Sequence, residues 1–347
     1  MAKQATIRDV ADAAKVSIAT VSRVLNKSSG VRPELAARVL RAADAMNYSP
    51  NAVARSLKKA HTASIAYLVS NISDPFFIAI ARGVESYIRN YGYNLMVCSI
   101  GHSKETEREY IQHLQGKKVD GMIINTTGYN DDLIANMSHQ IPVVLSNRRI
   151  DALDFIGDFV DNENVGCTYE LTKRLLMQGH KRIAIIYGPE HLSTAYERYR
   201  GFCSAMKEFD QIVDSSYPYQ YSSTFTRQTG FDGTNMMLSL PKPPTAFVFA
   251  SSELAFGGMR CFLQRRIQVP DEVSFVCVGD LPNREFLYIK PTLSSVNLQG
   301  MGERMAELLL ERINSDVTIQ NREIRFSSTI LEGNSIKTVR ISSKATV

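Results

Sequence analysis

The stretch "TIRDVADAAKVSIATVSRVLN", Thr6 to Asn26, decides the expected fold of the amino-terminal region. Its spacing predicts two short helices joined by a turn at Lys15, with Ser17 capping the second helix. A third helix, "PELAARVLRAADAMN", starts at Pro33, a residue that suits the first turn of a helix. Lys15 stands where such a turn often has glycine, and a left-handed backbone there would cost about 1 kcal/mol. Residues 6–47 are therefore expected to form a small three-helix head.

The second of these helices separates its side chains into two faces at about 100° per residue. Val21, Val24 and Leu25 make an apolar stripe that can pack on the first helix. The opposite face carries small side chains, hydrogen-bonding groups and one arginine, namely Ile18, Ala19, Ser22, Arg23 and Asn26. Small side chains allow close approach to a DNA major groove, and an arginine can bind guanine through two hydrogen bonds. This face predicts a DNA-reading helix, the alternative being an ordinary solvated helix face.

The composition describes a globular protein with a basic head. The chain has 347 residues, too many for one ordinary core, so two or three domains are expected. No window approaches about eighteen apolar residues and no basic start precedes an apolar stretch, so we expect a cytoplasmic protein without a membrane partner. Residues 1–60 hold eleven Lys/Arg against four Asp/Glu, whereas the remainder holds 29 against 31. This imbalance favours a polyanionic partner for the head alone, a merely solubilising charge being the alternative.

From Ser64 onward, short apolar strands alternate with amphipathic helices. The expected strands are 64–70, 94–100, 121–127, 142–147, 182–188, 245–251 and 273–279. The expected helices are 76–92, 105–117, 164–179, 195–209 and 253–267. Such alternation predicts parallel sheets covered on both faces, here as two α/β subdomains with a cleft between them. A further apolar segment, Met301–Ile313, is expected to be core rather than dimer interface.

The head sequence, followed by "YSPNAVARSLKK", resembles the DNA-binding head and hinge of the lactose-repressor/galactose-repressor (LacI/GalR) family of transcription regulators. The body resembles the same family and its relatives, the periplasmic sugar-binding proteins. The resemblance implies a small all-α helix-turn-helix head and a periplasmic-binding-protein-like α/β body of two parallel-sheet subdomains. It implies a DNA-binding domain (1–50), a hinge helix and linker (51–62), and an effector-binding and dimerisation domain (63–347). The last divides into an amino-terminal subdomain, about 63–162 plus 293–325, and a carboxy-terminal one, about 163–292 plus 326–347.

By that resemblance, the head and the hinge contact both grooves of an operator. The base readers are Ile18, Ala19 and Arg23. The phosphate contacts are Thr6, Ser17, Thr20, Ser22, Asn26, Tyr48 and Asn51. The hinge contacts are a minor-groove wedge, Leu57, a site of close helix approach, Ala54, and two residues near phosphates, Arg55 and Lys58. Because a palindrome needs two heads, the resemblance predicts a homodimer on a pseudo-palindromic double-stranded DNA operator, with larger assemblies left open.

The resemblance also places an effector in the cleft, at the carboxyl ends of the strands. Its expected contacts are Asp74, Phe76, Phe77, Asn147, Arg148, Arg198, Phe225, Ser251, Ser252 and Asp280. Polar groups combined with aromatic faces suit a sugar or polyol. Two serines, Ser251 and Ser252, replace the family's Asn-Asp pair, and "CVGD" displaces the family's aspartate, so a charged or modified sugar, a nucleoside or a phosphorylated compound stays open. The nearness of Arg148, Arg149 and Arg198 keeps an acidic sugar among these alternatives.

The function expected from these features is sequence-specific transcriptional regulation. The protein is expected to repress carbohydrate-utilisation genes, with a sugar-like effector controlling its DNA affinity. No GxGxxG after a strand, P-loop, GxSxG or HExxH motif is present, and the six His show no metal spacing, so neither an enzyme nor a metal or cofactor is expected. The five Cys are expected to be reduced core thiols. A periplasmic binding protein is the rival from another class, and a corepressor-dependent regulator is the rival within the class.

Overall fold

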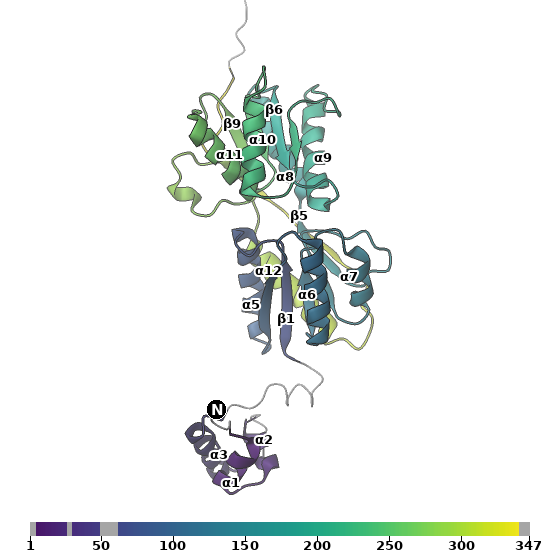
Figure 1. The fold of residues 1–347 in the computed structure, drawn as a ribbon, viewed down its shortest axis with the longest axis vertical. Coiled ribbons are helices and arrows are strands. Elements are labelled where there is room, and N and C mark those ends of the chain that lie inside the picture. Colours follow the sequence, from purple (N-terminus) through teal and green to yellow (C-terminus); the bar gives the residue numbers. More distant parts are fainter. Residues whose placement is uncertain (1–4, 26–29, 49–61, 340–347) are drawn as a thin grey trace, which may run out of the picture. The chain divides into compact units, whose positions relative to one another are not determined.

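The computed structural model describes residues 5–25, 30–48 and 62–339 of the chain. The chain separates into two compact units, Met1–Thr62 and Ala63–Val347. We call the first unit the head and the second the body. Figure 1 shows the helices of the head and the two layered halves of the body, coloured along the sequence.

Three helices make up the described part of the head, α1 (Ile7–Ala14), α2 (Ile18–Leu25) and α3 (Pro33–Ala45). Thr6 and Asp9 cap the start of α1 reciprocally, and the Ser17 hydroxyl accepts the Thr20 N–H at 3.2 Å at the start of α2. Pro33 occupies the first position of α3, where its missing N–H costs no hydrogen bond. The prediction of three short helices is confirmed.

The apolar stripe of α2 packs into the core of the head. Val21 and Val24 are buried together with Val10 of α1 and Val39 of α3, and the half-buried Leu25 packs against the same cluster. The predicted stripe is therefore confirmed. Its burial directs the polar side of α2 away from the head core.

The turn between α1 and α2 has a strained backbone. Lys15 adopts the left-handed conformation, with φ 50° and ψ 51°, a region that L-residues enter at a cost. Arg38 of α3 donates to the Ala14 carbonyl at 2.5 Å and to the Lys15 carbonyl at 3.4 Å. Arg38 thus satisfies carbonyl groups at the end of α1 and ties the turn to α3.

The first subdomain of the body contains a six-stranded parallel sheet in the order β11-β5-β4-β3-β1-β2. Its strands are β1 (Ser64–Val69), β2 (Asn94–Ser99), β3 (Gly121–Ile124), β4 (Val143–Ser146), β5 (Asp158–Asn162) and β11 (Glu323–Phe326). One face is covered by α5 (Pro75–Arg89) and α12 (Leu298–Ile313), and the other by α6 (Lys104–Gly116) and α7 (Asp131–Ser138) (Figure 1). Because side chains alternate along β1, Tyr67 faces α5 and α12 whereas Leu68 faces α6.

The second subdomain contains another six-stranded sheet, in the order β12-β10-β9-β8-β6-β7, and only β12 is antiparallel to its neighbour. Its strands are β6 (Ile183–Tyr187), β7 (Gln220–Ser222), β8 (Ala246–Phe249), β9 (Ser274–Val278), β10 (Thr292–Ser295) and β12 (Thr329–Leu331). Its helices pack in pairs, α8 (Asn164–Met177) with α9 (Ser193–Glu208) and α10 (Arg227–Leu238) with α11 (Ser252–Arg265). The pairs cover opposite faces of the sheet (Figure 1).

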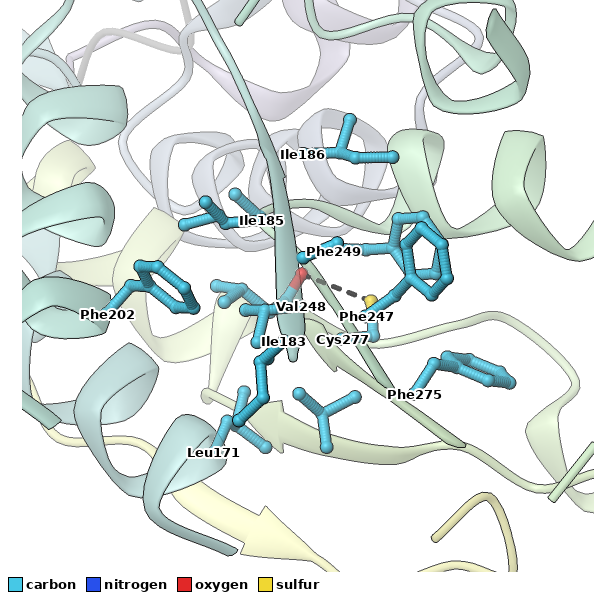
Figure 2. Packing of buried hydrophobic residues seen from close by; sticks show 14 of the residues in the cluster. Leu171, Ile183, Ile185, Ile186, Phe202, Phe247, Val248, Phe249, Phe275 and Cys277 are labelled. Atoms are coloured by element: carbon cyan, nitrogen blue, oxygen red, sulfur yellow. Dashed lines mark hydrogen bonds between the residues drawn. The ribbon is translucent and has the colours of Figure 1, made fainter. Parts of the chain in front are cut away.

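Aromatic rings fill the core of the second subdomain. Phe247 and Phe249 of β8 stack with their ring centroids 5.8 Å apart, and Phe275 of β9 meets Phe249 edge-on at the same distance. Figure 2 shows these three rings on one side of the sheet, with Phe202 of α9 on the other. Such large buried rings stabilise the sheet strongly and hold the loops at its edges in place.

The chain passes between the two sheets three times. The passages follow Asn162 at the end of β5, Ser295 at the end of β10 and Phe326 at the end of β11. Because β5 runs parallel to β4 and β10 runs parallel to β9, the loops at the carboxyl ends of both sheets face this passage region. The topology therefore creates a cleft between the subdomains.

The predicted alternation of strands and helices is confirmed, together with the fold class. All seven expected strands and five expected helices are present, with no end shifted by more than three residues. The pattern did not predict α7, α10, β5, β7, β10, β11 or β12. The segment Met301–Ile313 lies within α12, whose Met301, Met305 and Leu309 are fully buried, as expected of core. No helix in the described ranges is long and apolar enough to cross a membrane.

All five cysteines are free thiols. Cys167, Cys261 and Cys277 are buried, in agreement with the predicted core position, whereas Cys98 and Cys203 are only half-buried. Burial raises the pKa of each thiol, which keeps the groups in their unreactive protonated form.

Candidate effector-binding cleft and DNA-reading surface

A cleft of about 740 Å³, its open mouth included, lies between the two subdomains of the body. The structure brings all ten of the residues expected to contact the effector to its walls, namely Asp74, Phe76, Phe77, Asn147, Arg148, Arg198, Phe225, Ser251, Ser252 and Asp280. They come from loops and from the first two turns of helices at the carboxyl edges of both sheets. Their convergence is a finding of the structure, and their role in binding stays a prediction.

The start of α5 supplies an acid and an aromatic pair to the first wall. Asp74 caps α5, and its Oδ1 accepts the Phe76 N–H at 2.9 Å. The rings of Phe76 and Phe77 meet edge to face with centroids 5.1 Å apart. Burial raises the pKa of Asp74 to about 6, with a further contribution from the nearby Glu253 carboxylate. Asp74 is therefore a buried acceptor that is partly protonated around pH 6.

The end of β4 supplies the second feature of this wall. Asn147 has a left-handed backbone with φ 63°, a conformation often found at functional sites. Arg148 follows it and is only 4% exposed, and its Nη1 donates to the Thr126 carbonyl at 2.8 Å. Burial lowers the pKa of Arg148 to about 10, and repulsion from Arg198 adds to the effect. Arg148 still carries a full positive charge at neutral pH.

Arg198 of α9 is the buried arginine of the opposite wall, as Arg148 is of the first. Its Nε donates to the Asn164 Oδ1 at 2.8 Å, and its Nη1 donates to the Ala250 carbonyl at 2.6 Å. The Phe225 ring lies below both arginines, with its centroid 5.9 Å from the Arg198 guanidinium carbon and 5.8 Å from that of Arg148. The two arginines therefore lie within 6 Å of the centroid of the same aromatic ring, one from each subdomain.

The residues that depart from the family pattern also reach the cleft. Ser251 caps α11, and its hydroxyl accepts the Leu254 N–H at 3.2 Å. Ser252 follows as a buried residue. Asp280 lies after β9 and accepts the Ser295 hydroxyl at 2.6 Å, while burial raises the pKa of its carboxyl. Asp280 therefore remains a lining residue despite its shifted position in the sequence.

Sequence reasoning missed several lining residues. Asn162 ends β5, Thr194 lies in the first turn of α9, and His102 follows β2. Burial lowers the pKa of His102 to about 4, and Arg148 adds to this shift, so the imidazole is neutral at pH 7. The signal available for Asn162 was the polar end of the strand "DFVDN".

Four buried polar atoms of the lining have no hydrogen-bond partner among the described residues. They are Asn147 Oδ1, Arg148 Nε, Asn162 Oδ1 and Thr194 Oγ1. Buried polar groups are rarely left unsatisfied, because each one costs about 1–3 kcal/mol. Both donors and acceptors are represented, so the cleft wall can form hydrogen bonds with a polar molecule.

Arg149 does not belong to the cleft, although the sequence suggested a cluster of three arginines. Its side chain is about half exposed and donates to Glu323 of β11 at 2.7 Å. Its guanidinium group lies 5.1 Å from the centroid of the Phe159 ring. The expected cluster is therefore reduced to Arg148 and Arg198.

The outer face of α2 is available for contact on the head. Ile18 is 41% exposed, and Ala19 and Arg23 are exposed beside it. Among the expected phosphate contacts, Thr6 and Ser17 are exposed, whereas Thr20, Ser22 and Tyr48 are half-buried. Six further expected contacts, Asn26, Asn51, Ala54, Arg55, Leu57 and Lys58, lie outside the described residues.

Comparison with known proteins gives both parts of the chain a family. Residues 6–51 match the family "Bacterial regulatory proteins, lacI family", and residues 62–330 match "Periplasmic binding proteins and sugar binding domain of LacI family". The HTH-type transcriptional repressor PurR of Haemophilus influenzae (strain PittEE) is 32% identical over 313 residues, covering 89% of this chain and 91% of the relative. PurR of Vibrio campbellii is 32% identical and covers 96% of this chain and 99% of the relative.

Solved structures show the same architecture. The transcriptional regulator CelR in complex with cellobiose is 26% identical, with a TM-score of 0.71, covering 95% of this chain and 99% of that one. The lac repressor dimer bound to operator and the anti-inducer ONPF is 23% identical and shares the fold, with a TM-score of 0.81 over 96% of this chain and all of that one. Members of this family are transcriptional repressors rather than enzymes. The chain belongs to the LacI family of DNA-binding transcriptional repressors and carries that family's effector-binding domain.

Proposed function

We propose that this repressor binds a pseudo-palindromic operator as a homodimer and that a small polar effector in the cleft controls its affinity for DNA. Residues 1–50 read the operator, 51–62 form the hinge, and 63–347 bind the effector and dimerise. The head acts through base contacts by Ile18, Ala19 and Arg23 on the exposed face of α2. In the hinge, Leu57 inserts into the minor groove, flanked by Ala54, Arg55 and Lys58.

The observation that best supports effector binding in the cleft is the set of four unpaired buried polar atoms in its wall. A bound molecule that supplies their missing partners makes different contacts in the open and closed arrangements of the subdomains. It therefore shifts the population between these arrangements, with a coupling of about 1–3 kcal/mol. Movement of the first subdomain changes the spacing of the two hinges, and hence the affinity for the operator.

The proposed effector is a sugar or sugar derivative. Asp74 and Asp280 can accept hydroxyl groups, and the rings of Phe76 and Phe225 can cover the apolar C–H face of a sugar. The complex of the related CelR with cellobiose agrees with this class. A purine-related compound is the second candidate, because the PurR relatives share 32% identity over most of the chain.

Selection of bound duplexes from a random DNA library tests the proposal. The full chain is used alone and with D-ribose, cellobiose, adenine or hypoxanthine. A pseudo-palindromic sequence is expected to emerge, and one ligand is expected to weaken or strengthen its binding. Release by the ligand identifies an inducer, and enhancement identifies a corepressor. Binding that shows no sequence preference under any of these conditions contradicts the proposal.

A further inference from the structure

We propose that the effector carries an anionic group, a carboxylate or a phosphate, which binds between Arg148 and Arg198. This inference rests on the proposed function, since it concerns the ligand of the same cleft. It selects sugar acids and sugar phosphates over neutral sugars and bare purine bases.

The two guanidinium groups are placed to share one ligand. Arg148 comes from the first subdomain and Arg198 from the second, and both line the cleft. Each guanidinium carbon lies just under 6 Å from the centroid of the Phe225 ring. Each residue is more than nine-tenths buried. An anion bound here touches both subdomains and reduces the repulsion between the two cations.

Neither arginine is neutralised by a carboxylate at hydrogen-bond distance in the described part of the chain. The hydrogen bonds of both groups go to neutral oxygens, those of Thr126, Asn164 and Ala250. The Nε of Arg148 is buried and donates to no group among the described residues. A guanidinium group has five N–H donors, so both groups retain capacity for an anion.

The same protein shows how it neutralises a buried arginine that has a structural role. Arg312 of α12 has a side chain only 6% exposed and donates to both carboxylate oxygens of the buried Asp158 at 2.8 Å. That arrangement is the ordinary solution for a buried guanidinium group. Its absence at Arg148 and Arg198 indicates that the missing carboxylate or phosphate belongs to a ligand.

Two acids close to the arginines are committed to other donors. Glu107 accepts the Thr127 N–H at 2.9 Å and the Asn130 side-chain amide at 2.8 Å. Asp161 accepts the Asn162 N–H at 2.7 Å and the Asn164 side-chain amide at 2.8 Å.

Two of the nearby acids are also partly protonated near neutrality. Burial raises the pKa of Asp161 to about 7, as it raises that of Asp74 to about 6. Asp74 already accepts the N–H of Phe76. Around pH 6–7 these two carboxylates therefore offset only part of the positive charge of Arg148 and Arg198.

The start of α9 adds to this positive field. No side chain caps the first turn of α9, and Thr194 in that turn has a buried hydroxyl without a partner among the described residues. The N-terminus of a helix carries a partial positive charge that favours anions. Thr194 also lines the cleft. It can donate to the same anion while the hydroxyl groups of the ligand reach Asp74 and Asp280.

Inorganic phosphate is the first probe, because its use does not require knowledge of the natural effector. The thermal midpoint of the full chain is compared in sodium phosphate and in sodium chloride at matched pH and ionic strength. Three proteins are used, the wild type, Arg148→Gln and the matched control Arg149→Gln, which changes the neighbouring arginine outside the cleft. Phosphate is expected to raise the midpoint of the wild type and of the control but not that of Arg148→Gln.

The results decide the inference directly. Phosphate affinity is expected to fall about tenfold or more in Arg148→Gln, as for loss of a hydrogen bond to a charged group. An equal rise in all three proteins, or a rise in none, overturns the anion site. A far-UV circular dichroism spectrum and a thermal midpoint in sodium chloride that match those of the wild type report that Arg148→Gln is folded. Arg148→Lys, which keeps the charge, is expected to recover part of the phosphate response.

A matched set of ligands then distinguishes the two sources of negative charge. Calorimetric titration compares D-glucose with D-glucuronate and D-glucose 6-phosphate, and adenosine with adenosine monophosphate. Tighter binding of an anionic member, lost in Arg148→Gln and kept in Arg149→Gln, supports the inference and identifies carboxylate or phosphate. Equal or tighter binding of the neutral members overturns it.

Failure of this inference is distinguishable from failure of the proposed function. A neutral sugar or purine that changes operator affinity, with no response to phosphate, overturns the anion site and leaves the proposed function intact. A phosphate response that depends on Arg148, with no ligand affecting operator binding, supports the anion site and contradicts control of DNA affinity through the cleft.

Discussion

The backbone strain at Lys15 is expected to lower the stability of the head. Its left-handed backbone between α1 and α2 is a conformation that glycine adopts freely. Lys15→Gly is therefore expected to stabilise the head by up to about 1 kcal/mol. Amide hydrogen exchange of α1 and α2 in the full chain measures the change. The control is Lys15→Ala, which removes the charge but keeps the backbone strain. If amide exchange also becomes slower in Lys15→Ala, the stabilisation comes from loss of the charge and not from relief of backbone strain.

Arg23 carries the prediction for base recognition. It is exposed on the outer face of α2, and its guanidinium group can read one guanine in each half-site. Arg23→Ala is expected to relax base preference at one position per half-site, with a loss of about 1–3 kcal/mol on the preferred sequence.

Sequencing of duplexes selected from a random library measures the preference. Arg41→Ala is the matched control, since Arg41 is an exposed arginine of α3. Unchanged preference in Arg23→Ala, or the same relaxation in Arg41→Ala, rejects the assignment.

At the scale of elements, Asp158 joins three parts of the first subdomain. It begins β5, and its buried carboxylate accepts hydrogen bonds from Arg312 at the end of α12 and Arg322 before β11. Asp158→Asn leaves Arg312 buried and unpaired, and is expected to lower the free energy of unfolding by about 3–5 kcal/mol. Denaturation by urea, followed by circular dichroism because the chain has no Trp, measures the loss.

The same group predicts a dependence of stability on pH. Burial alone would raise the pKa of Asp158, but hydrogen bonds from Arg312 and Arg322 hold it below its ordinary value. The stabilisation is thus present above the pKa of the unfolded chain, about 3.9, and is lost as the pH falls through the folded value. Between pH 5 and 3, the wild type is expected to lose more stability than Asp158→Asn. The control is Glu85→Gln, which breaks the exposed ion pair between Glu85 and Arg89. It is expected to lower the free energy of unfolding by under about 1 kcal/mol.

Elements with strong local patterns were predicted, and elements that depend on tertiary contacts were missed. The head helices and β1 have clear periodicity and caps or dense apolar runs. In contrast, α10 contains Gly230, Gly233 and two threonines in twelve residues, which lowers its intrinsic helix propensity. It forms because Gly230 allows the backbone of α11 to approach closely. The strand β5 is missed for a related reason, since its buried Asp158 finds its partners, Arg312 and Arg322, in distant parts of the chain.

At the scale of the whole body, several contacts join the two subdomains beside the cleft. The Arg149 N–H donates to the Ser193 hydroxyl at 2.9 Å, and the His191 Nε2 lies 3.1 Å from the Thr127 carbonyl oxygen. The ring of His191 also packs on Tyr129, with centroids 4.4 Å apart. These contacts form only when the two walls are close, so they favour the arrangement seen in this structure.

Ser193→Ala removes one of these contacts and is expected to shift the population of arrangements. The coupling between effector and operator is expected to change by about 0.5–2 kcal/mol, equivalent to roughly two- to thirtyfold in effector affinity. Because coupling is reciprocal, the effector's influence on operator affinity changes by the same factor. Titration of effector with and without operator measures both sides. Ser216→Ala, on an exposed loop of the second subdomain, is the control, and equal effects in both variants reject a role for the cleft contact.

The sequence by itself determined the three-helix head, the alternation of strands and helices, and the ten residues that meet in the cleft. The head and the alternation follow from periodicity and capping, and the place of the cleft follows from the rule that parallel strands present their carboxyl ends at one edge. The ten residues themselves came from the resemblance to the LacI/GalR family. Only the tertiary structure decided which neighbouring side chain enters the cleft. The left-handed Asn147 turns the chain at the end of β4, so that Arg148 is buried against Phe225 while Arg149 pairs with Glu323 outside. Side-chain direction after a strand depends on backbone geometry and on distant partners, and neither is encoded in local spacing.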